Sequence, residues 1–303
     1  MSACLLPPPL GPEQRVALLS PSGPIAQEAL DAGSKALQEQ GLDVDFSGLG
    51  GELSEYQYLA QSDARRLQAL MTALQDSDLG ALLSVRGGYG AMRLLAPLTA
   101  ACAKAPPSPK RYVGFSDATA LHAFLHFRLG WASISGPMPL NMATWPQMAA
   151  DVAQALRQSA PIEQRFEGLG CERPGRATGR LFGGNLSLIE ALYRSPFLPS
   201  LEGVVLMLED VGERLYRLDR LLTALALRGA AQELRGIVLG SFSQVPDADE
   251  RAASAHVAAL LQPWGLPMVS GMPFGHTAQN RCIWLGSHAE LDADAGALRL
   301  TLG

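Results

Sequence analysis

The chain has 303 residues, of which 48% are hydrophobic and 17% are charged, and its formal net charge is −5. A chain this long and this apolar buries a large core, which excludes a disordered protein and a mini-protein held together by disulfides. Its negative charge provides no basic field for a phosphate backbone, so we expect no nucleic-acid partner.

The first half of the chain alternates short apolar runs with segments of helical spacing. The repeated strand–loop–helix pattern predicts an α/β fold, with a parallel sheet covered by helices on both faces. Strands are predicted at 16–19, 42–46, 79–85 and 111–115, and helices at 26–40, 62–74, 91–98 and 118–129.

The pattern weakens over residues 146–175, which are polar, irregular and rich in glycine and proline near their end. This composition is typical of a connection between domains. We therefore expect an N-terminal domain over residues 1–145, a linker over 146–175 and a C-terminal domain over 176–303. In the C-terminal part, Gly183-Gly184-Asn185 predicts a turn before a helix. Strands are predicted at 204–208 and 236–239, and helices at 213–227 and 250–261.

The cysteine spacing, the N-terminal sequence and the length of the apolar segments predict the cellular compartment of the protein. The four cysteines are far apart and form no Cys-x-x-Cys pair, which is typical of reduced thiols. The N-terminus has no basic region of the kind that begins a signal peptide, and no window holds the roughly 18 consecutive apolar residues of a membrane helix. We therefore expect a cytoplasmic protein without a membrane partner.

Gly114-Phe115-Ser116-Asp117-Ala118 places a serine between a predicted strand and a predicted helix, with small residues two positions before and after it. The pattern is close to the G-x-S-x-G nucleophile elbow, in which a sharp turn exposes the hydroxyl at a helix N-terminus. The free N–H groups of that terminus suit a developing oxyanion. The alternative is that Ser116 or Asp117 only caps the helix.

Two further motifs also end predicted strands. Arg86-Gly87-Gly88-Tyr89-Gly90 fits no phosphate-binding consensus, but its adjacent glycines let a backbone N–H approach a ligand; a plain tight turn is the alternative. The strand at 204–208 runs into Glu209-Asp210, where Glu209 is a candidate to orient a histidine and Asp210 a candidate cap of the next helix. An acidic metal cluster is the competing interpretation, but no histidine spacing supports it.

Five histidines are present. His122 and His126 are four residues apart on a predicted helix, a spacing that suits a metal pair, but no third ligand is evident and we interpret them as helix-face residues. His256 and His288 fall in a predicted surface helix and strand. His276 lies in a glycine- and proline-rich loop that can present a side chain at a site.

Ser116, Glu209 and His276 together supply a nucleophile, an orienting acid and a general base. They fall within motifs by which the chain resembles the LD-carboxypeptidase family, comprising the murein tetrapeptide carboxypeptidases and, as a related branch, the microcin C self-immunity peptidases. The motifs follow the family order: Ser20-Pro21-Ser22-Gly23, Arg86-Gly87-Gly88-Tyr89-Gly90, Gly114-Phe115-Ser116-Asp117, Gly183-Gly184-Asn185-Leu186, Leu208-Glu209-Asp210-Val211-Gly212-Glu213, Tyr216-Arg217-Leu218-Asp219-Arg220, and Gly275-His276 with Asn280.

The resemblance implies a role for each site residue. Ser116 is the implied nucleophile, His276 the general base and acid, and Glu209 the carboxylate that orients it, with Glu213 as its rival. The backbone N–H groups of Gly88 and Asp117 are the implied oxyanion hole.

The same resemblance implies a parallel-sheet N-terminal domain like that of class I glutamine amidotransferases and a smaller C-terminal α/β domain. The implied active site lies between them. Family members are typically homodimers and use no metal or cofactor.

The implied activity is hydrolysis of the bond that joins the third residue of murein tetrapeptide to its terminal D-alanine, in peptidoglycan recycling. A substrate that ends in a carboxylate needs a cation, and Arg86 and Arg217 are the candidates. The alternatives are a microcin C-type self-immunity peptidase, an α/β-hydrolase esterase that shares the Ser–acid–His order, and a binding module without activity.

Overall fold

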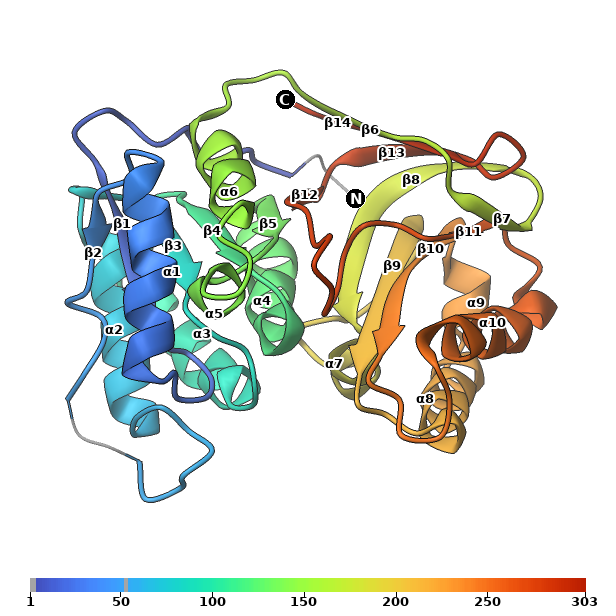
Figure 1. Cartoon of the computed structure of the whole chain (residues 1–303), viewed down its shortest axis with the longest axis horizontal. Coiled ribbons are helices and arrows are strands. Elements are labelled where there is room, and N and C mark those ends of the chain that lie inside the picture. The colour runs from blue at the N-terminus through green and yellow to red at the C-terminus, as the bar shows by residue number, and fades with distance from the viewer. Residues whose placement is uncertain (1–3, 52–53) are drawn as a thin grey trace. The chain divides into compact units, whose positions relative to one another are not determined.

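The computed structural model describes residues 4–51 and 54–303 (Figure 1). Its contacts divide the chain into two compact units, with the boundary between Ser159 and Ala160. We call them the N-terminal unit and the C-terminal unit. Within the described residues, no helix is both long and apolar enough to cross a bilayer.

The N-terminal unit is built on a parallel sheet. Its central strand β3 has the sequence LGALLS and is buried throughout, as expected for a strand covered on both faces. The strand order is β5-β4-β3-β1-β2, and every neighbouring pair is parallel. The strands are β1 (Arg15–Leu19), β2 (Val44–Asp45), β3 (Leu79–Ser84), β4 (Arg111–Gly114) and β5 (Ser133–Ser135).

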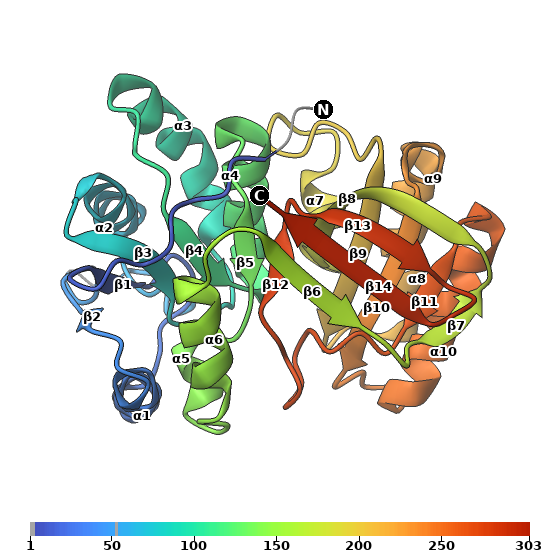
Figure 2. The ribbon, with the colours of Figure 1, turned by 90° about the horizontal axis from the view of Figure 1, so that it is seen from above.

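Helices cover both faces of this sheet, which confirms the predicted arrangement. In Figure 2, three helices lie on one face, namely α1 (Gln27–Glu39), α5 (Pro139–Met142) and α6 (Met148–Arg157). The other face carries α2 (Asp63–Gln75), α3 (Leu95–Lys104) and α4 (Thr119–Leu129). Two short 3-10 helices, η1 (Ala91–Leu94) and η2 (Ser116–Ala118), lead into α3 and α4.

A helix and two strands occupy much of the segment 146–175, whose composition predicts a linker. Helix α6 buries an apolar face that includes Val152 and Leu156. Strands β6 (Ile162–Phe166) and β7 (Gly170–Arg173) lie at the two edges of the second sheet. Edge strands are short and carry many polar residues, which is why their sequence looks irregular.

The C-terminal unit contains a mixed sheet in the order β6-β14-β13-β8-β9-β10-β11-β7. Strands β8 to β11 are parallel to one another, and the flanking pairs are antiparallel. Its other strands are β8 (Arg176–Asn185), β9 (Val204–Val211), β10 (Gly236–Ser243), β11 (Met268–Ser270), β13 (His288–Asp292) and β14 (Ala297–Leu302). The unit also contains β12 (Ile283–Leu285), which is not a strand of this sheet.

The core of the C-terminal unit lies on both faces of strands β8 to β10. One face packs Leu181, Met207 and Val238 against apolar side chains of β12, β13 and β14. On the other side, α7 (Leu186–Leu192) contacts β8 and β9, α10 (Glu250–Leu261) contacts β10, and α8 (Leu215–Leu227) packs against both helices. The short helices α9 (Ala230–Glu233) and η3 (Gln262–Trp264) follow α8 and α10 in the chain.

Two predictions about local structure in this unit are wrong. Gly183-Gly184-Asn185 ends strand β8 rather than forming a separate turn, and a Cβ atom at Gly183 would lie 1.9 Å from the carbonyl oxygen of Met207. The glycine therefore allows β8 to approach β9 closely. Strand β9 continues to Val211, so Glu209 and Asp210 lie within the strand and not after it.

Candidate active site

Ser116 stands where β4 turns into η2, as the sequence predicts. Its φ of 62° is in the left-handed region, a conformation that costs free energy for a residue with a side chain. The turn brings Gly114 and Ala118 close together, since a Cβ atom at Gly114 would lie 2.8 Å from the Cβ of Ala118. The close approach of these two positions therefore requires small residues two before and two after Ser116. The Ser116 side chain remains partly exposed.

His122 supports this turn from the core. Its Nε2 lies 2.8 Å from the carbonyl oxygen of Gly114, and its Nδ1 lies 2.8 Å from Oγ of Ser133. A carbonyl only accepts, so Nε2 carries the proton and Nδ1 accepts from the hydroxyl. Burial lowers the pKa of His122 to about 4, so the ring is neutral.

The second histidine of α4, His126, has a different contact. His126 lies 3.3 Å from Sγ of Cys4 through its Nδ1. Over residues 4–51 and 54–303, no group of three or more His, Cys, Asp or Glu side chains is arranged to hold a metal ion. Both histidines lie on α4 and are buried.

The glycine motif after β3 lies directly against Ser116. A Cβ atom at Gly87 would lie 2.9 Å from Cβ of Ser116, 3.0 Å from its Oγ and 3.5 Å from the backbone nitrogen of Asp117. The N–H of Gly23 donates to the carbonyl of Gly87 over 3.0 Å. Gly88 is exposed and has a φ of 105°, which favours glycine. Only a glycine at position 87 leaves space between this loop and the serine hydroxyl.

The side chain of Asp117 does not cap its own helix. Its Oδ2 accepts a 2.6 Å hydrogen bond from Oγ of Ser22 and a 2.8 Å hydrogen bond from the N–H of Ala91, at the start of η1. Burial raises the pKa of Asp117, opposed by the hydrogen bond from Ser22 and the charge of Arg66. The N-cap residues of η2 and α4 are Phe115 and Ala118, so neither Ser116 nor Asp117 occupies the predicted N-cap position.

In the C-terminal unit, Glu209 and His276 form a hydrogen-bonded pair. The Nδ1 of His276 lies 2.8 Å from Oε2 of Glu209, whose side chain is only 2% exposed. Burial lowers the pKa of His276, but the hydrogen bond and the charge of Glu209 raise it, with a contribution from Asp210, and the net shift is upward. Asn185 donates to the other oxygen of Glu209 over 3.3 Å, so the carboxylate is held from two sides.

The loop that carries His276 approaches Glu209 closely. Gly275 has a φ of 110°, and a Cβ atom there would lie 2.4 Å from Oγ of Ser241 and 3.1 Å from Cβ of Glu209. The N–H of Gly275 donates to Oδ1 of Asn280 over 3.2 Å. Glycine at position 275 is therefore required for His276 to reach the carboxylate.

Asp210 has a different role from the predicted helix cap. Its Oδ2 accepts from the N–H of Ser187 over 3.0 Å and from its hydroxyl over 2.8 Å, so it holds the start of α7 and not that of α8. Asn185 donates to Oδ1 over 2.9 Å, which links Asp210 to Glu209. Burial and the neighbouring Glu209 charge raise the pKa of Asp210 to about 6.

The two candidate arginines each have a partner within their own unit. Nη1 of Arg86 donates to the carbonyl of Pro24, and Nε of Arg217 forms a 3.2 Å ion pair with Glu213. The structure thus brings Glu209 to His276, whereas Glu213 pairs with Arg217.

Two polar side chains at these sites were not predicted to act there. The sequence pattern places Asn185 in a turn and predicts no contact with Glu209 for it. Arg66 lies in the polar sequence DARRLQ of α2 and resembles a surface residue, yet it is 2% exposed. Its glycine and proline partners lie far away in the sequence, so no local signal identifies it.

The chain is similar to known proteins over nearly its whole length. A family model described as the LD-carboxypeptidase N-terminal domain matches residues 16–136, and one described as the C-terminal domain matches 178–291. A carboxypeptidase homologue of Streptomyces coelicolor is 37% identical over 99% of this chain and 97% of its own. The murein tetrapeptide carboxypeptidase of Pseudomonas aeruginosa is 33% identical over 92% of this chain and 94% of its own.

Solved structures show the same fold. The muramoyltetrapeptide carboxypeptidase from Oxalobacter formigenes superposes with a TM-score of 0.80 at 27% identity, covering 96% of this chain and 99% of that one. The microcin C7 self-immunity protein in its apo state superposes with a TM-score of 0.87 over 99% of both chains, but at 20% identity this likeness concerns the fold alone. The chain belongs to the LD-carboxypeptidase family.

Proposed function

We propose that the protein is a serine-type LD-carboxypeptidase that releases the terminal D-alanine of murein tetrapeptide in peptidoglycan recycling. The observation that carries this proposal is the backbone of Ser116, held at a φ of 62° between β4 and η2 with Gly87 packed against its hydroxyl. Strain of this kind persists at functional sites, where the surrounding structure enforces it. The identity to a murein tetrapeptide carboxypeptidase supports the substrate class.

His276 is the proposed general base. A carboxylate accepts only, so Nδ1–H of His276 donates to Glu209, and Nε2 is the ring atom that would take a proton from Ser116. The serine oxygen then attacks the scissile carbonyl, and the imidazolium returns its proton to the leaving amine of D-alanine. Water hydrolyses the acyl-enzyme in the second half of the reaction, with His276 again as base. This mechanism requires Nε2 of His276 to reach Oγ of Ser116 in the working enzyme.

The proposed oxyanion hole consists of the N–H groups of Gly88 and Asp117. The nitrogen of Asp117 faces the space that a side chain at Gly87 would fill. Each such donor stabilises the transition state by roughly 3 kcal/mol in other enzymes. Arg86 and Arg217 remain the proposed partners of the substrate carboxylate, because a guanidinium binds a carboxylate in a bidentate manner.

The decisive experiment incubates the protein with murein tetrapeptide and follows the loss of one alanine by mass spectrometry. We expect cleavage by the wild type, none above background by Ser116→Ala, and a large loss with His276→Ala. The matched control is His288→Ala, because the His288 side chain is 54% exposed on β13. Turnover by Ser116→Ala, or equal loss with both histidine variants, would contradict the mechanism.

A second arm separates the alternatives. Cleavage of an aminoacyl sulfamoyl adenosine without cleavage of tetrapeptide would favour a microcin-type peptidase. Hydrolysis of simple esters alone would favour an esterase. Either result would replace the proposed substrate while leaving the fold and family unchanged.

A further inference from the structure

Two buried charged side chains in the N-terminal unit bind the same two segments of the chain, Pro21-Ser22 and Gly90-Ala91. Arg66, on α2, is 2% exposed, and Asp117, on η2, is 1% exposed. Charges are rarely buried so completely, because the loss of hydration costs several kcal/mol unless partners compensate for it. Their partners therefore indicate what these two residues do.

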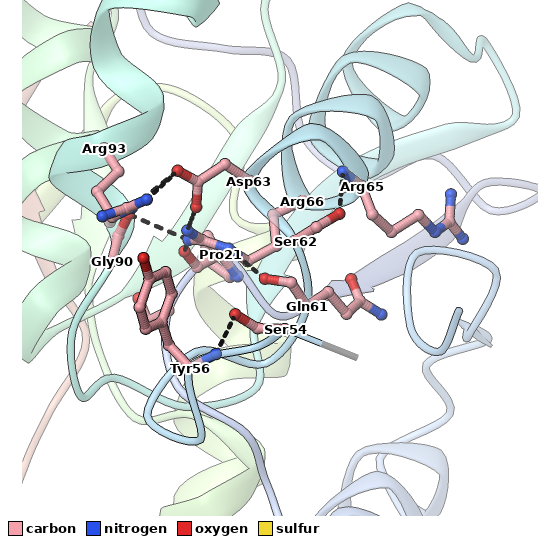
Figure 3. Close-up of polar contacts among 12 residues, drawn as sticks. Pro21, Ser54, Tyr56, Gln61, Ser62, Asp63, Arg65, Arg66, Gly90 and Arg93 are labelled. Atoms are coloured by element: carbon pink, nitrogen blue, oxygen red, sulfur yellow. Dashed lines mark hydrogen bonds and ion pairs between the residues drawn. The ribbon is translucent and has the colours of Figure 1, made fainter. Parts of the chain in front are cut away.

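Arg66 reaches two separate loops with one nitrogen. Its Nη1 donates to the carbonyl of Pro21 and, over 3.0 Å, to the carbonyl of Gly90 (Figure 3). The Nε donates to the carbonyl of Gln61 over 3.2 Å, and Nη2 pairs with Asp63 at the start of the helix. The planar guanidinium thus ties the loop after β1 to the loop after β3.

Asp117 binds the residue that follows each of the two carbonyls bound by Arg66. Its Oδ2 accepts from the hydroxyl of Ser22 over 2.6 Å and from the N–H of Ala91 over 2.8 Å. Because Ser22 follows Pro21 and Ala91 follows Gly90, each dipeptide is bound once by the cation and once by the carboxylate. We call Arg66 and Asp117 together the clamp.

The clamp holds the glycine motif against Ser116. Gly87 and Gly88 lie just before the clamped Gly90, and the carbonyl of Gly87 accepts a 3.0 Å hydrogen bond from Gly23, just after the clamped Ser22. Asp117 is the chain neighbour of the nucleophile, so its carboxylate connects the serine turn directly to the far end of the glycine loop.

We propose that Arg66 and Asp117 are positioning residues that set the distance between the Gly87–Gly88 backbone and the hydroxyl of Ser116. The inference rests on the proposed function, in which the N–H of Gly88 binds the oxyanion. A donor fixed to within about 0.5 Å is what electrostatic stabilisation of a transition state requires. Asp117 thus acts through its side chain, in addition to the role proposed for its backbone N–H.

The first test removes one contact of the clamp with the least disturbance. Ser22→Ala deletes the hydroxyl that donates to Asp117, and Ser34→Ala deletes another buried serine hydroxyl on α1 as the matched control. We expect kcat of Ser22→Ala on tetrapeptide to fall about tenfold with KM within about twofold, because only the transition state needs the fixed donor. Ser34→Ala keeps the wild-type kcat.

The second test does not depend on activity. Arg66→Lys keeps the charge but replaces the rigid guanidinium plane by one mobile ammonium. In that plane, Nε and Nη2 bind Gln61 and Asp63 and so hold Nη1 between Pro21 and Gly90. Hydrogen exchange followed by mass spectrometry should become at least about tenfold faster in the peptide that covers residues 85–91, with unchanged exchange in the strands of the N-terminal unit.

The outcomes separate the two hypotheses. A wild type that does not cleave tetrapeptide contradicts the proposed function, and the exchange measurement then still decides whether the clamp fixes the loop. An active wild type with unchanged kcat in Ser22→Ala overturns the positioning role alone. Faster exchange throughout the N-terminal unit of Arg66→Lys, without a local effect, also overturns it, because Arg66 would then serve stability only.

Discussion

Adding one methyl group at Gly87 tests the proposed geometry around Ser116. Gly87 is buried and is not among the residues of positive φ, so alanine suits its backbone and only the lack of space opposes it. The new Cβ would lie 2.9 Å from Cβ of Ser116 and 3.0 Å from its Oγ. Carbon atoms in contact prefer roughly 3.5 to 4.0 Å, so the loop and the serine must separate by about half an ångström or more.

This displacement sets the expected magnitude. A reacting group misplaced by about 1 Å costs roughly 100-fold in rate, and loss of one oxyanion donor costs roughly 100- to 1,000-fold. We therefore expect kcat/KM of Gly87→Ala on murein tetrapeptide to fall by about 100-fold. Overpacking a core costs about 1–3 kcal/mol, so the folded state should survive.

The assay measures kcat/KM together with the urea-induced unfolding free energy. Gly11→Ala is the matched control, since its added Cβ would meet only the flexible end of Gln14, at 3.1 Å, and it should retain wild-type activity. Labelling of Ser116 by a fluorophosphonate should slow in Gly87→Ala as kcat/KM does. A folded Gly87→Ala enzyme with wild-type kcat/KM would refute the placement of the oxyanion site beside this glycine.

Three further predictions concern ionisable groups. Glu209→Gln removes the charge that raises the pKa of His276, while burial still lowers it. The acidic limb of the pH profile of kcat/KM should therefore move to lower pH, and kcat should fall roughly 100-fold or more. An acidic limb at the wild-type pH would contradict the proposed coupling between Glu209 and His276. The pKa of His122 is about 4 in the folded protein and about 6.5 in the unfolded chain, so the contribution of its neutral ring to stability is complete above about pH 6.5 and is lost as the pH falls. The difference in unfolding free energy between wild type and His122→Gln should therefore shrink by about 3 kcal/mol from pH 7 to pH 4. Arg111 is fully buried and donates to three carbonyls, one in the N-terminal segment and two at the end of α6. Arg111→Met should therefore lower the free energy of unfolding, measured in urea, by about 3 kcal/mol. A loss below about 1 kcal/mol would show that those carbonyls find other partners.

Local sequence pattern determined the elements with a strong period. The helix predicted at 250–261 is α10, with the same bounds, because an Asp249 cap precedes an uninterrupted helical pattern. The strand at 79–85 and the turn that exposes Ser116 were also predictable, since a short apolar run and flanking small residues are local signals. The parallel N-terminal sheet follows from the repeat of such units.

Elements whose stability depends on distant partners were not predictable. The polar edge strands β6 and β7 receive their backbone hydrogen bonds from β14 and β11, so their own sequence carries little signal. The strand β9 continues through two acidic residues, because Asn185 and Ser187 on neighbouring elements satisfy these carboxylates. Pattern alone ends such a strand too early.

The sequence by itself determined which residue types stand at the candidate site and in which order: a glycine loop, a serine on a tight turn, an acid and a histidine. Only the tertiary structure decided which carboxylate meets His276, and it brought Glu209 there while Glu213 pairs with Arg217. It also buried Arg66 and Asp117 against partners that lie up to 95 residues away in the chain. Hydrogen bonds over such separations are set by the packing of whole elements, which no local window of the sequence contains.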